Sequence, residues 1–200
     1  MRTWLYIDGN HLHQAAFSGT SLSRLNPVAL VEQAFPSNAI HCAKFFATPI
    51  SGADFPVEQV ETQRRYWVLL RSLPNFYLIE GRFRRRVVPA GAGFRVEERG
   101  SDVNLTAHLL SDLMLGCFDV AIIVTANPDL ALPIRLARQF SGLPVGVLNP
   151  QRLSGPGRPE ARPCAELRDA ASFYQNGVTW SQLQRAQFAA ALDRPEGLSA

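Results

Sequence analysis

The sequence predicts an α/β fold, a three-layer α/β/α sandwich with a mostly parallel sheet of about five strands. Short apolar segments rich in β-branched and aromatic residues alternate with segments of helical periodicity. Such alternation is typical of parallel strands joined by helices that cover both faces of a sheet. The segment DVAIIVTA at 119–126 is apolar almost throughout, as expected for a strand buried on both faces.

The first part of the chain begins this alternation. TWLYI at 3–7 predicts a buried strand that ends at an Asp-Gly-Asn loop, and residues 10–18 predict a first helical turn or two. Asn26-Pro27 starts the next predicted helix, because proline suits the first helical position. AIHCAKFFAT at 39–48 is the second predicted strand.

The middle of the chain continues the pattern. Apolar residues at helical spacing predict a helix at 56–72, and FYLIEGRF predicts a third strand at 76–83. Residues 84–98 predict a β-hairpin around the segment Ala-Gly-Ala-Gly at 90–93. The remaining expected elements are a helix at 102–115, a strand at 119–126, a helix at 129–140 and a strand at 144–150.

Residues 1–150 therefore form the predicted domain, and residues 151–200 are expected to be a connector with a short helical extension. The connector opens with QRLSGPGRPEARP, whose Pro, Gly and Arg content predicts a loop. Short helices are expected at 160–168 and 179–190, and Thr179 is the expected N-cap of the second.

Composition excludes several protein classes. No segment resembles a secretory signal, and no apolar stretch reaches the roughly 18 residues of a membrane helix. The three cysteines lack zinc-ligand spacing and favour free thiols in a reducing compartment. We therefore expect a soluble, cytoplasmic protein without membrane contact. Apart from Lys44, the Lys and Arg residues are all arginines, which suits phosphate binding, although a GC-rich genome explains arginine enrichment as well.

Three acidic residues occupy positions where a parallel sheet commonly binds ligands. Asp8 follows the first strand and Asp129 follows the strand at 119–126, so both should lie at the carboxyl edge of the sheet. Asp102 opens a helix, where the helix dipole favours an anion. An ordinary turn, helix cap or first-turn acid explains each one singly. Converging carboxylates, however, need a cation, and Mg²⁺ or Mn²⁺ takes oxygen ligands and activates water against phosphate.

Polar side chains near these acids complete the predicted catalytic site. Asn127 supplies a carbonyl oxygen that could ligate the metal ion, and Thr125 could orient a carboxylate or a metal-bound water. Asn10 and His11 follow the first acid closely, where contact with substrate is expected. His108 lies further along the helix that the second acid opens, as a candidate base or phosphate contact. A packed or solvent-facing histidine explains His108 equally well.

The densest basic run lies in the predicted hairpin. Alternation places Arg84 and Arg86 on one face of a strand and Arg85 on the other. A phosphate-binding ridge formed by Arg82, Arg84, Arg86 and Arg99 is one interpretation. A solvated hairpin edge protected by charge is the other.

Three motifs resemble the NYN-domain family, the LabA-like branch of the PIN-type nuclease fold. They are YIDGNHL at 6–12, ERGSDVNLTAHLLSDL at 98–113 and DVAIIVTANPDLALPIRLA at 119–137. The resemblance covers about residues 3–150. It implies a PIN-like (Rossmann-like) sheet, bacterial-type ribonuclease activity, and an acidic Mg²⁺ or Mn²⁺ site at Asp8, Asp102 and Asp129.

The sequence departs from the family pattern at three positions. His11 stands where the family's asparagine is usual, with Asn10 one place early. Asn127 stands where the third motif usually has its first aspartate. His108 stands where many members have aspartate, although histidine is a known variant in the branch with the Gly-Ser-Asp-Val-Asn pattern. Loss of a carboxylate lowers the negative charge of the site and its affinity for a metal ion.

Three hypotheses about function follow. The first is a metal-dependent ribonuclease that hydrolyses RNA phosphodiester bonds through an Asp-bound Mg²⁺ or Mn²⁺. The second, motivated by Asn127, is a catalytically weakened or inactive RNA-binding or regulatory protein. The third is an enzyme like those relatives of this branch that hydroxylate a pyridine compound, although no flavin or haem motif supports redox chemistry. The sequence leaves the RNA substrate, the number of metal ions and the oligomeric state open, a homodimer included.

Overall fold

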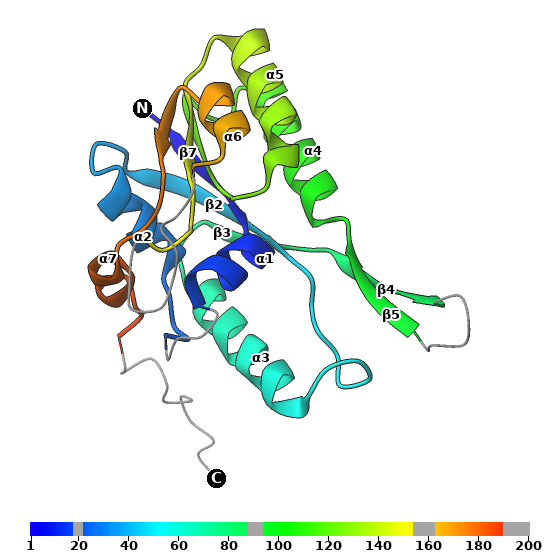
Figure 1. The fold of residues 1–200 in the computed structure, drawn as a ribbon. Helices are drawn as coiled ribbons and strands as arrows, with labels where there is room; N and C mark the ends of the chain where they lie inside the picture. The colour runs from blue at the N-terminus through cyan, green and yellow to red at the C-terminus, as the bar shows by residue number, and fades with distance from the viewer. Residues whose placement is uncertain (18–21, 88–93, 154–162, 190–200) are drawn as a thin grey trace.

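A six-stranded parallel sheet forms the centre of the molecule (Figure 1). The computed structural model describes residues 1–17, 22–87, 94–153 and 163–189. Neighbouring strands in the order β3-β2-β1-β6-β7-β8 all pair in parallel. The strands are β1 (Thr3–Asp8), β2 (Ile40–Ala47), β3 (Phe76–Glu80), β6 (Val120–Val124), β7 (Val145–Leu148) and β8 (Phe173–Gln175).

Helices pack on both faces of this sheet and divide the core into two clusters. One cluster contains residues of α1 (Gly9–Leu12), α2 (Pro27–Ala34), α3 (Val57–Arg71) and α7 (Trp180–Arg185). The other contains residues of α4 (Ser101–Met114), α5 (Ala131–Ser141) and α6 (Ala165–Ala170). A π-helical turn, η1 (His13–Phe17), follows α1, and a 3-10 turn, η2 (Pro128–Leu130), precedes α5. The predicted three-layer α/β/α class is confirmed.

The central strands β1 and β6 are buried on both faces, which makes them a rigid base for the loops that follow them. Leu5 and Ile7 of β1 face one core cluster, while Tyr6 faces the other, as period-two alternation requires. Every residue of β6 is buried. The apolar run at 119–126 thus predicted its environment correctly, because only a strand covered on both faces can use apolar residues throughout.

The predicted hairpin is present as a separate two-stranded sheet that projects from the domain (Figure 1). Its antiparallel strands are β4 (Arg82–Val87) and β5 (Phe94–Arg99). The expected strand at 76–83 is in fact two strands, because the chain leaves the central sheet after Glu80. The expected turn at 90–93 lies outside the described residues.

Residues beyond 150 contribute to the same sheet, which the predicted domain boundary did not anticipate. The three-residue strand β8 pairs with β7 and gives a sixth strand in place of about five. It was missed because Phe173–Gln175 is too short to show a period. Helix α6 begins at Ala165, not at 160, whereas Thr179 caps α7 as predicted, in a capping box with Gln182. Residues 154–162 of the connector and the tail at 190–200 lie outside the described residues.

The strand order reverses between β1 and β6, and this reversal determines where ligands can gather. From β1 the chain builds outward to β2 and β3, and from β6 it builds outward in the opposite direction. Open α/β sheets bind ligands at such a switch point, beyond the carboxyl ends of the two central strands. No helix in the described part of the chain is long and apolar enough to cross a membrane.

Candidate active site

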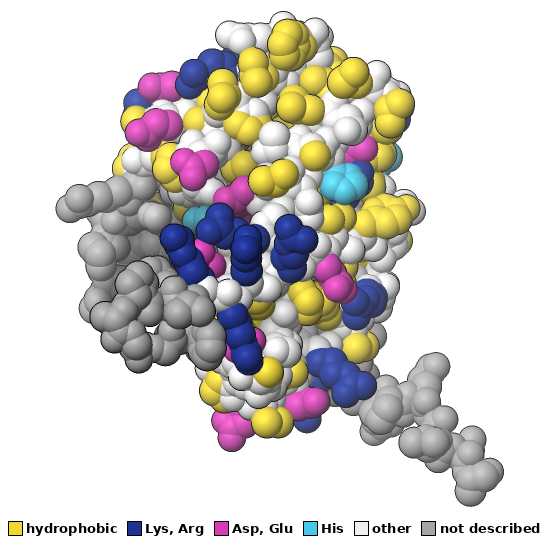
Figure 2. Space-filling model, turned by 90° about the vertical axis from the view of Figure 1, so that its right-hand side faces the viewer, with side chains coloured by type: hydrophobic (Ala, Val, Ile, Leu, Met, Phe, Trp, Pro, Cys, Tyr) yellow, Lys and Arg dark blue, Asp and Glu magenta, His cyan; other side chains and the backbone are white. Residues whose placement is uncertain are grey.

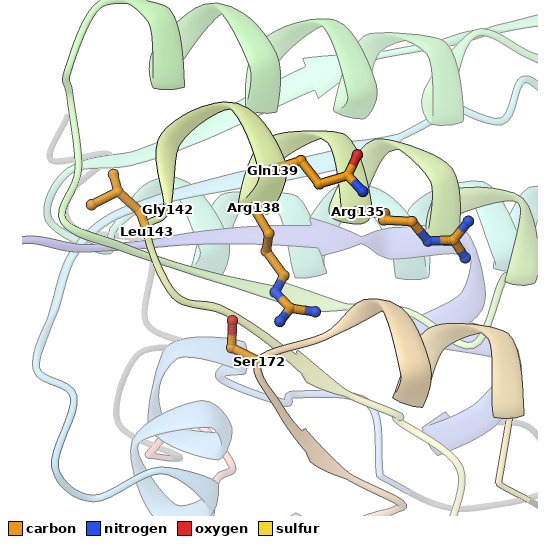
Figure 3. Close-up of a pocket in the computed structure, with 6 residues that line it drawn as sticks. All are labelled: Arg135, Arg138, Gln139, Gly142, Leu143 and Ser172. Atoms are coloured by element: carbon orange, nitrogen blue, oxygen red, sulfur yellow. The ribbon is translucent and has the colours of Figure 1, made fainter.

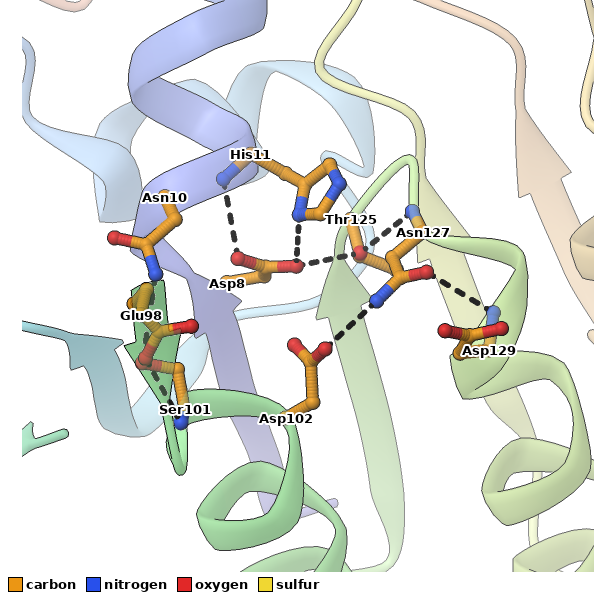
Figure 4. A network of polar contacts seen from close by, with 9 residues as sticks. All are labelled: Asp8, Asn10, His11, Glu98, Ser101, Asp102, Thr125, Asn127 and Asp129. Atoms are coloured by element: carbon orange, nitrogen blue, oxygen red, sulfur yellow. Dashed lines mark hydrogen bonds and ion pairs between the residues drawn. The ribbon is translucent and has the colours of Figure 1, made fainter. Parts of the chain in front are cut away.

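Asp8, Asp102 and Asp129 lie around this switch point, and the charges of Asp8 and Asp129 both act on Asp102 (Figure 4). Asp8 is the last residue of β1, Asp129 lies in the η2 turn after β6, and Asp102 lies in the first turn of α4. Their burial differs, since Asp8 is 1% exposed, Asp102 is half-buried and Asp129 is exposed. Among the residues described, no arginine or lysine forms an ion pair with any of the three.

Asp8 is held in one orientation by three hydrogen bonds. Its Oδ1 accepts the backbone N–H of His11 at 3.1 Å and so caps α1, and its Oδ2 accepts the Thr125 hydroxyl at 2.9 Å. The Nδ1 of His11 lies 2.7 Å from the same Oδ2. Thr125 is fully buried and orients the carboxylate, as predicted. Gly9 is required beside Asp8, because a Cβ there would overlap the Phe45 ring and the Phe46 carbonyl.

Asn127 caps the η2 turn, and this role fixes the orientation of its amide. Its Oδ1 accepts the backbone N–H of Asp129 at 3.1 Å, so its Nδ2 must face the other way and donates to Asp102 Oδ2 at 2.9 Å. Figure 4 shows this amide lying among the three carboxylates. The Oδ1 of Asn127, which we expected to ligate a metal ion, thus already accepts one backbone hydrogen bond, and the atom that contacts Asp102 is Nδ2.

The electrostatics of the site reflect crowding of negative charge. Burial raises the pKa of Asp102 above its usual value, and the nearby charges of Asp8, Glu98 and Asp129 raise it further. The hydrogen bond to Asp8 raises the pKa of His11, although burial acts against it. Carboxylates that disfavour each other's ionised form in this way are stabilised by any cation that enters between them. In the described part of the chain, no three His, Cys, Asp or Glu side chains are close enough to hold a metal ion as they stand.

Glu98, at the end of β5, is a fourth acid at the site that sequence reasoning missed. Its Oε1 accepts hydrogen bonds from the Thr48 hydroxyl at 2.8 Å and from the Ser101 hydroxyl at 2.7 Å. Asn10 reaches the same group, because its Nδ2 lies 3.4 Å from the Ser101 Oγ. The only signal in the sequence was its place four residues before Asp102 in ERGSD.

Gly100 joins β5 to α4 and explains the glycine of this motif. It adopts a φ of 103°, a backbone conformation that residues with a side chain rarely take. This turn brings Ser101 and Asp102 to the start of α4 beside the end of β1. The glycine is therefore a geometric requirement of the second motif.

His108 is not brought to the acids. It lies further along α4, where its Nδ1 is 3.2 Å from Lys44 Nζ and its ring packs against Phe46. Burial and the Lys44 charge lower the pKa of His108. Lys44 also binds Asp112 at 2.6 Å, and Tyr6 donates to Asp112 at 2.8 Å. His108 thus belongs to a separate, half-buried network, because six residues along a helix rotate a side chain away from the starting face.

The predicted arginine ridge lies on one face of the hairpin. Arg82, Arg84 and Arg86 are exposed, and register places Arg82 opposite Arg99. Glu97 of β5 lies opposite Arg84, binds Arg99 at 2.7 Å and lies 3.8 Å from Arg86. Arg85 points to the other face and binds Asp54 at 2.8 Å, as the predicted alternation requires. Figure 2, which views the side on which the hairpin projects, shows a group of basic side chains there.

A cavity of about 810 Å³ adjoins the acids. Asp8, His11, Glu98 and Asp102 form part of its wall. The rest comes from α1, η1, the segment before α2, β2, α3, the loop between these last two elements, and β4 of the hairpin. Five aromatic side chains line it, namely Phe45, Phe55, Tyr66, Trp67 and Phe83. No pattern in the sequence predicted this cavity, because its aromatic residues come from four separate segments.

A second cavity, of about 360 Å³, lies between α5 and the start of β8, and none of the three acids lines it (Figure 3). Two arginines line it, but Arg138 donates to the carbonyl oxygens of Ala170 and Ala171 at 2.6 and 3.0 Å. Its guanidinium therefore serves to cap the end of α6, and we do not treat this cavity as the functional site.

Comparison with known proteins shows the fold and leaves the family open. No protein-family model matches the chain. A 6-hydroxy-3-succinoylpyridine 3-monooxygenase from Pseudomonas putida is 27% identical over 75% of this chain, which spans 60% of that protein's length. A crystal structure of a protein of unknown function from Vibrio parahaemolyticus superposes with a TM-score of 0.58 and 15% identity, covering 90% of this chain and 92% of the other. The second comparison supports the three-layer α/β/α class.

Proposed function

We propose that this protein is a metal-dependent ribonuclease of the NYN type, acting in the cytoplasm on RNA phosphodiester bonds. The observation that carries the proposal is the position of Asp8, Asp102 and Asp129, which meet at the switch point of the sheet without a lysine or arginine ion-pair partner among the described residues. The exposed arginines of the hairpin add a surface on which flanking phosphates can bind.

The donor set fits Mg²⁺ or Mn²⁺ in its chemistry. Asp8 and Asp102 bring carboxylate oxygens, and burial together with the charge of Asp8 raises the pKa of Asp102. Asp129 adds a third carboxylate. We assign Asp8 and Asp102 as the main ligands and Asp129 as a ligand through water. A divalent ion bound there would supply an activated water and neutralise charge on the phosphate.

The protein's own side chains would prepare this site before substrate arrives. Thr125 and the His11 backbone hold the Asp8 carboxylate in place, so it loses little entropy on binding a ligand. The imidazole of His11, oriented by Asp8 and lining the cavity, can donate a hydrogen bond to a phosphate oxygen. Arg84 and Arg86 would bind phosphates further along the RNA strand.

The direct test is cleavage of a labelled single-stranded RNA after the protein has been stripped with EDTA. We expect no cleavage in EDTA, and cleavage restored by Mn²⁺ or Mg²⁺ but not by Ca²⁺, which is larger and binds with less regular geometry. RNA binding that persists in EDTA with no cleavage under any metal would instead support the non-catalytic RNA-binding hypothesis.

The Asn127→Asp substitution separates these two hypotheses. The introduced carboxylate would still cap the Asp129 N–H, but it replaces a donor to Asp102 with a further negative charge. Without metal, we expect a lower melting temperature because a hydrogen bond becomes a charge repulsion. With Mn²⁺, we expect a larger rise in melting temperature than for the wild type, and faster cleavage. Equal shifts in both proteins would argue against a metal ion at this position.

The role of the hairpin can be measured through salt dependence. Replacing both Arg84 and Arg86 with glutamine should weaken RNA binding and reduce the slope of log K against log salt by about 1.4, the value for two lost single-strand phosphate contacts. Arg64→Gln on α3, 77% exposed, is the matched control and should leave the slope unchanged. An unchanged slope in the double variant would show that the hairpin is only a protected edge.

A second candidate is favoured by the Pseudomonas putida relative, whose name describes oxygenation of a substituted pyridine. The aromatic cavity could hold such a ring. A succinoyl substituent carries a carboxylate, however, and no lysine or arginine among the described residues lines the cavity. We therefore rank this candidate below the ribonuclease. Turnover of 6-hydroxy-3-succinoylpyridine with O₂ and a reduced nicotinamide or flavin would reverse that order.

A further inference from the structure

The aromatic cavity and the acidic cluster are one continuous space. Asp8, His11 and Asp102 belong to the wall of the cavity, so a ligand that fills it also touches the proposed catalytic groups. At about 810 Å³ the cavity is large enough for a planar ring with a sugar attached. The residues that line the cavity therefore determine which chemical group can bind next to the scissile bond.

Aromatic rings line the cavity from two directions. Phe45 and Tyr66 form an edge-to-face pair with centroids 6.3 Å apart, next to Trp67. Phe55 and Phe83 form a second pair at 5.1 Å, and Phe83 comes from the hairpin. Faces of aromatic side chains stack on nucleobases of any sequence.

The remaining polar lining favours a neutral or electron-poor ring over an anion. Four acids face the space, namely Asp8, Glu58, Glu98 and Asp102, and no lysine or arginine among the described residues lines it. Away from a divalent ion bound at Asp8 and Asp102, these acids would repel a phosphate group, whereas the base of a nucleotide carries no charge at neutral pH. The exposed amide of Gln59 offers hydrogen bonds to the edge of a base.

The outer wall of the cavity is braced by the protein itself. Gln63 of α3 donates to the Thr48 carbonyl at 3.0 Å and accepts the Ile50 N–H at 2.9 Å. These two bonds fix the segment between β2 and α3 against the helix. A ligand consequently enters a cavity whose shape is already set, which lowers the entropic cost of binding.

We propose that this cavity binds a nucleobase of the RNA strand, unstacked from its neighbours, while the adjoining phosphate lies at the acids. The inference rests on the proposed ribonuclease function and assigns it a substrate feature, namely a single-stranded nucleotide with an exposed base. Double-stranded RNA cannot present such a base without unpairing. The arginine ridge of the hairpin then binds the phosphates that follow.

The test uses the full chain in EDTA, with adenosine or uridine as the probe and ribose 5-phosphate as the control without a base. Both nucleosides should quench the emission of Trp67, and the Trp67→Phe variant identifies that signal. The Phe55→Ala/Phe83→Ala variant should weaken nucleoside binding by about tenfold, as expected for loss of stacking. The Phe55→Ala/Phe83→Tyr variant should keep part of the nucleoside binding, because tyrosine can still stack on a base. Phe140→Ala is the control, because Phe140 is 79% exposed on α5 and does not line the cavity, and it should leave nucleoside binding unchanged.

A second measurement separates failure of the cavity from failure of the ribonuclease. RNA oligomers with a single abasic position, moved along the chain, should be cleaved about tenfold more slowly at one register only, again through lost stacking. Uniform cleavage of all abasic oligomers, or no nucleoside binding by a protein that cleaves RNA, would overturn the cavity proposal alone. Nucleoside binding that survives in a protein unable to cleave any RNA would support the cavity and overturn the ribonuclease.

Discussion

Replacing Asp102 with asparagine is expected to slow RNA cleavage by about 100-fold or more, the cost of removing one group that stabilises developing charge. The asparagine keeps the size of the side chain, and its carbonyl oxygen can still accept the Asn127 amide at the same place. The loss should therefore be chemical. Initial rates on one RNA at saturating Mn²⁺ measure it.

The same variant should be more stable than the wild type in EDTA. Because burial and neighbouring acids raise the pKa of Asp102, its ionised form is disfavoured in the folded protein. The penalty is absent below the ordinary pKa of an aspartate, grows as pH rises towards the raised value, and is complete above it. Asp102→Asn should thus raise the melting temperature at pH 7 and have a much smaller effect near pH 3, where the carboxyl is mostly protonated in both states.

Asp169→Asn is the matched control, because Asp169 is 66% exposed on α6 and its carboxylate pairs with Arg168. It should alter neither the rate nor the melting temperature. Equal RNA cleavage by the wild type and Asp102→Asn would identify the activity as a contaminant.

The largest effect on stability is expected from Asp112→Ala. Asp112 is 7% exposed and accepts hydrogen bonds from Tyr6 and from the largely buried Lys44. Removing it leaves the Lys44 ammonium without its carboxylate, which costs about 3–5 kcal/mol for a buried pair. Urea unfolding with a two-state fit measures the change in the free energy of unfolding.

The control for this experiment removes both charges. A Lys44→Met/Asp112→Leu variant replaces the pair with apolar side chains of similar size, which is often neutral or stabilising. If the double variant loses as much stability as Asp112→Ala, the cost comes from the buried Tyr6 hydroxyl left without its acceptor and from altered packing, and not from an unpaired charge.

The sequence predicted those features that depend on local pattern. Periodicity identified β6 and the helices on either side of it, and Asp8 and Asp129 were placed correctly because parallel strands bring their carboxyl ends to one edge. Cap chemistry identified Thr179. Each of these inferences needs only a few neighbouring residues.

Features that depend on tertiary contact were missed or misplaced. The strand β8 has three residues and exists only because β7 offers an edge. His108 shares a helix with Asp102 but points to Lys44, which no spacing rule fixes without knowing the neighbouring strand. The side chain of Asn127 has an oxygen that can ligate a metal ion, yet a hydrogen bond from the backbone N–H of Asp129 determines which of its atoms faces the acids. Glu98 could be identified as a residue of the site only from the structure, in which β5 places it beside Thr48.

The continuity of β5 and α4 through Gly100 has a mechanical consequence. Gly100 joins the hairpin that carries the arginines directly to the helix that carries Asp102, whereas Asp8 is the last residue of a central strand. An RNA strand that tilts the hairpin when it binds is therefore expected to change the separation between Asp102 and Asp8. By thermodynamic linkage, RNA and the divalent ion should each tighten the binding of the other, and deleting the hairpin should weaken both.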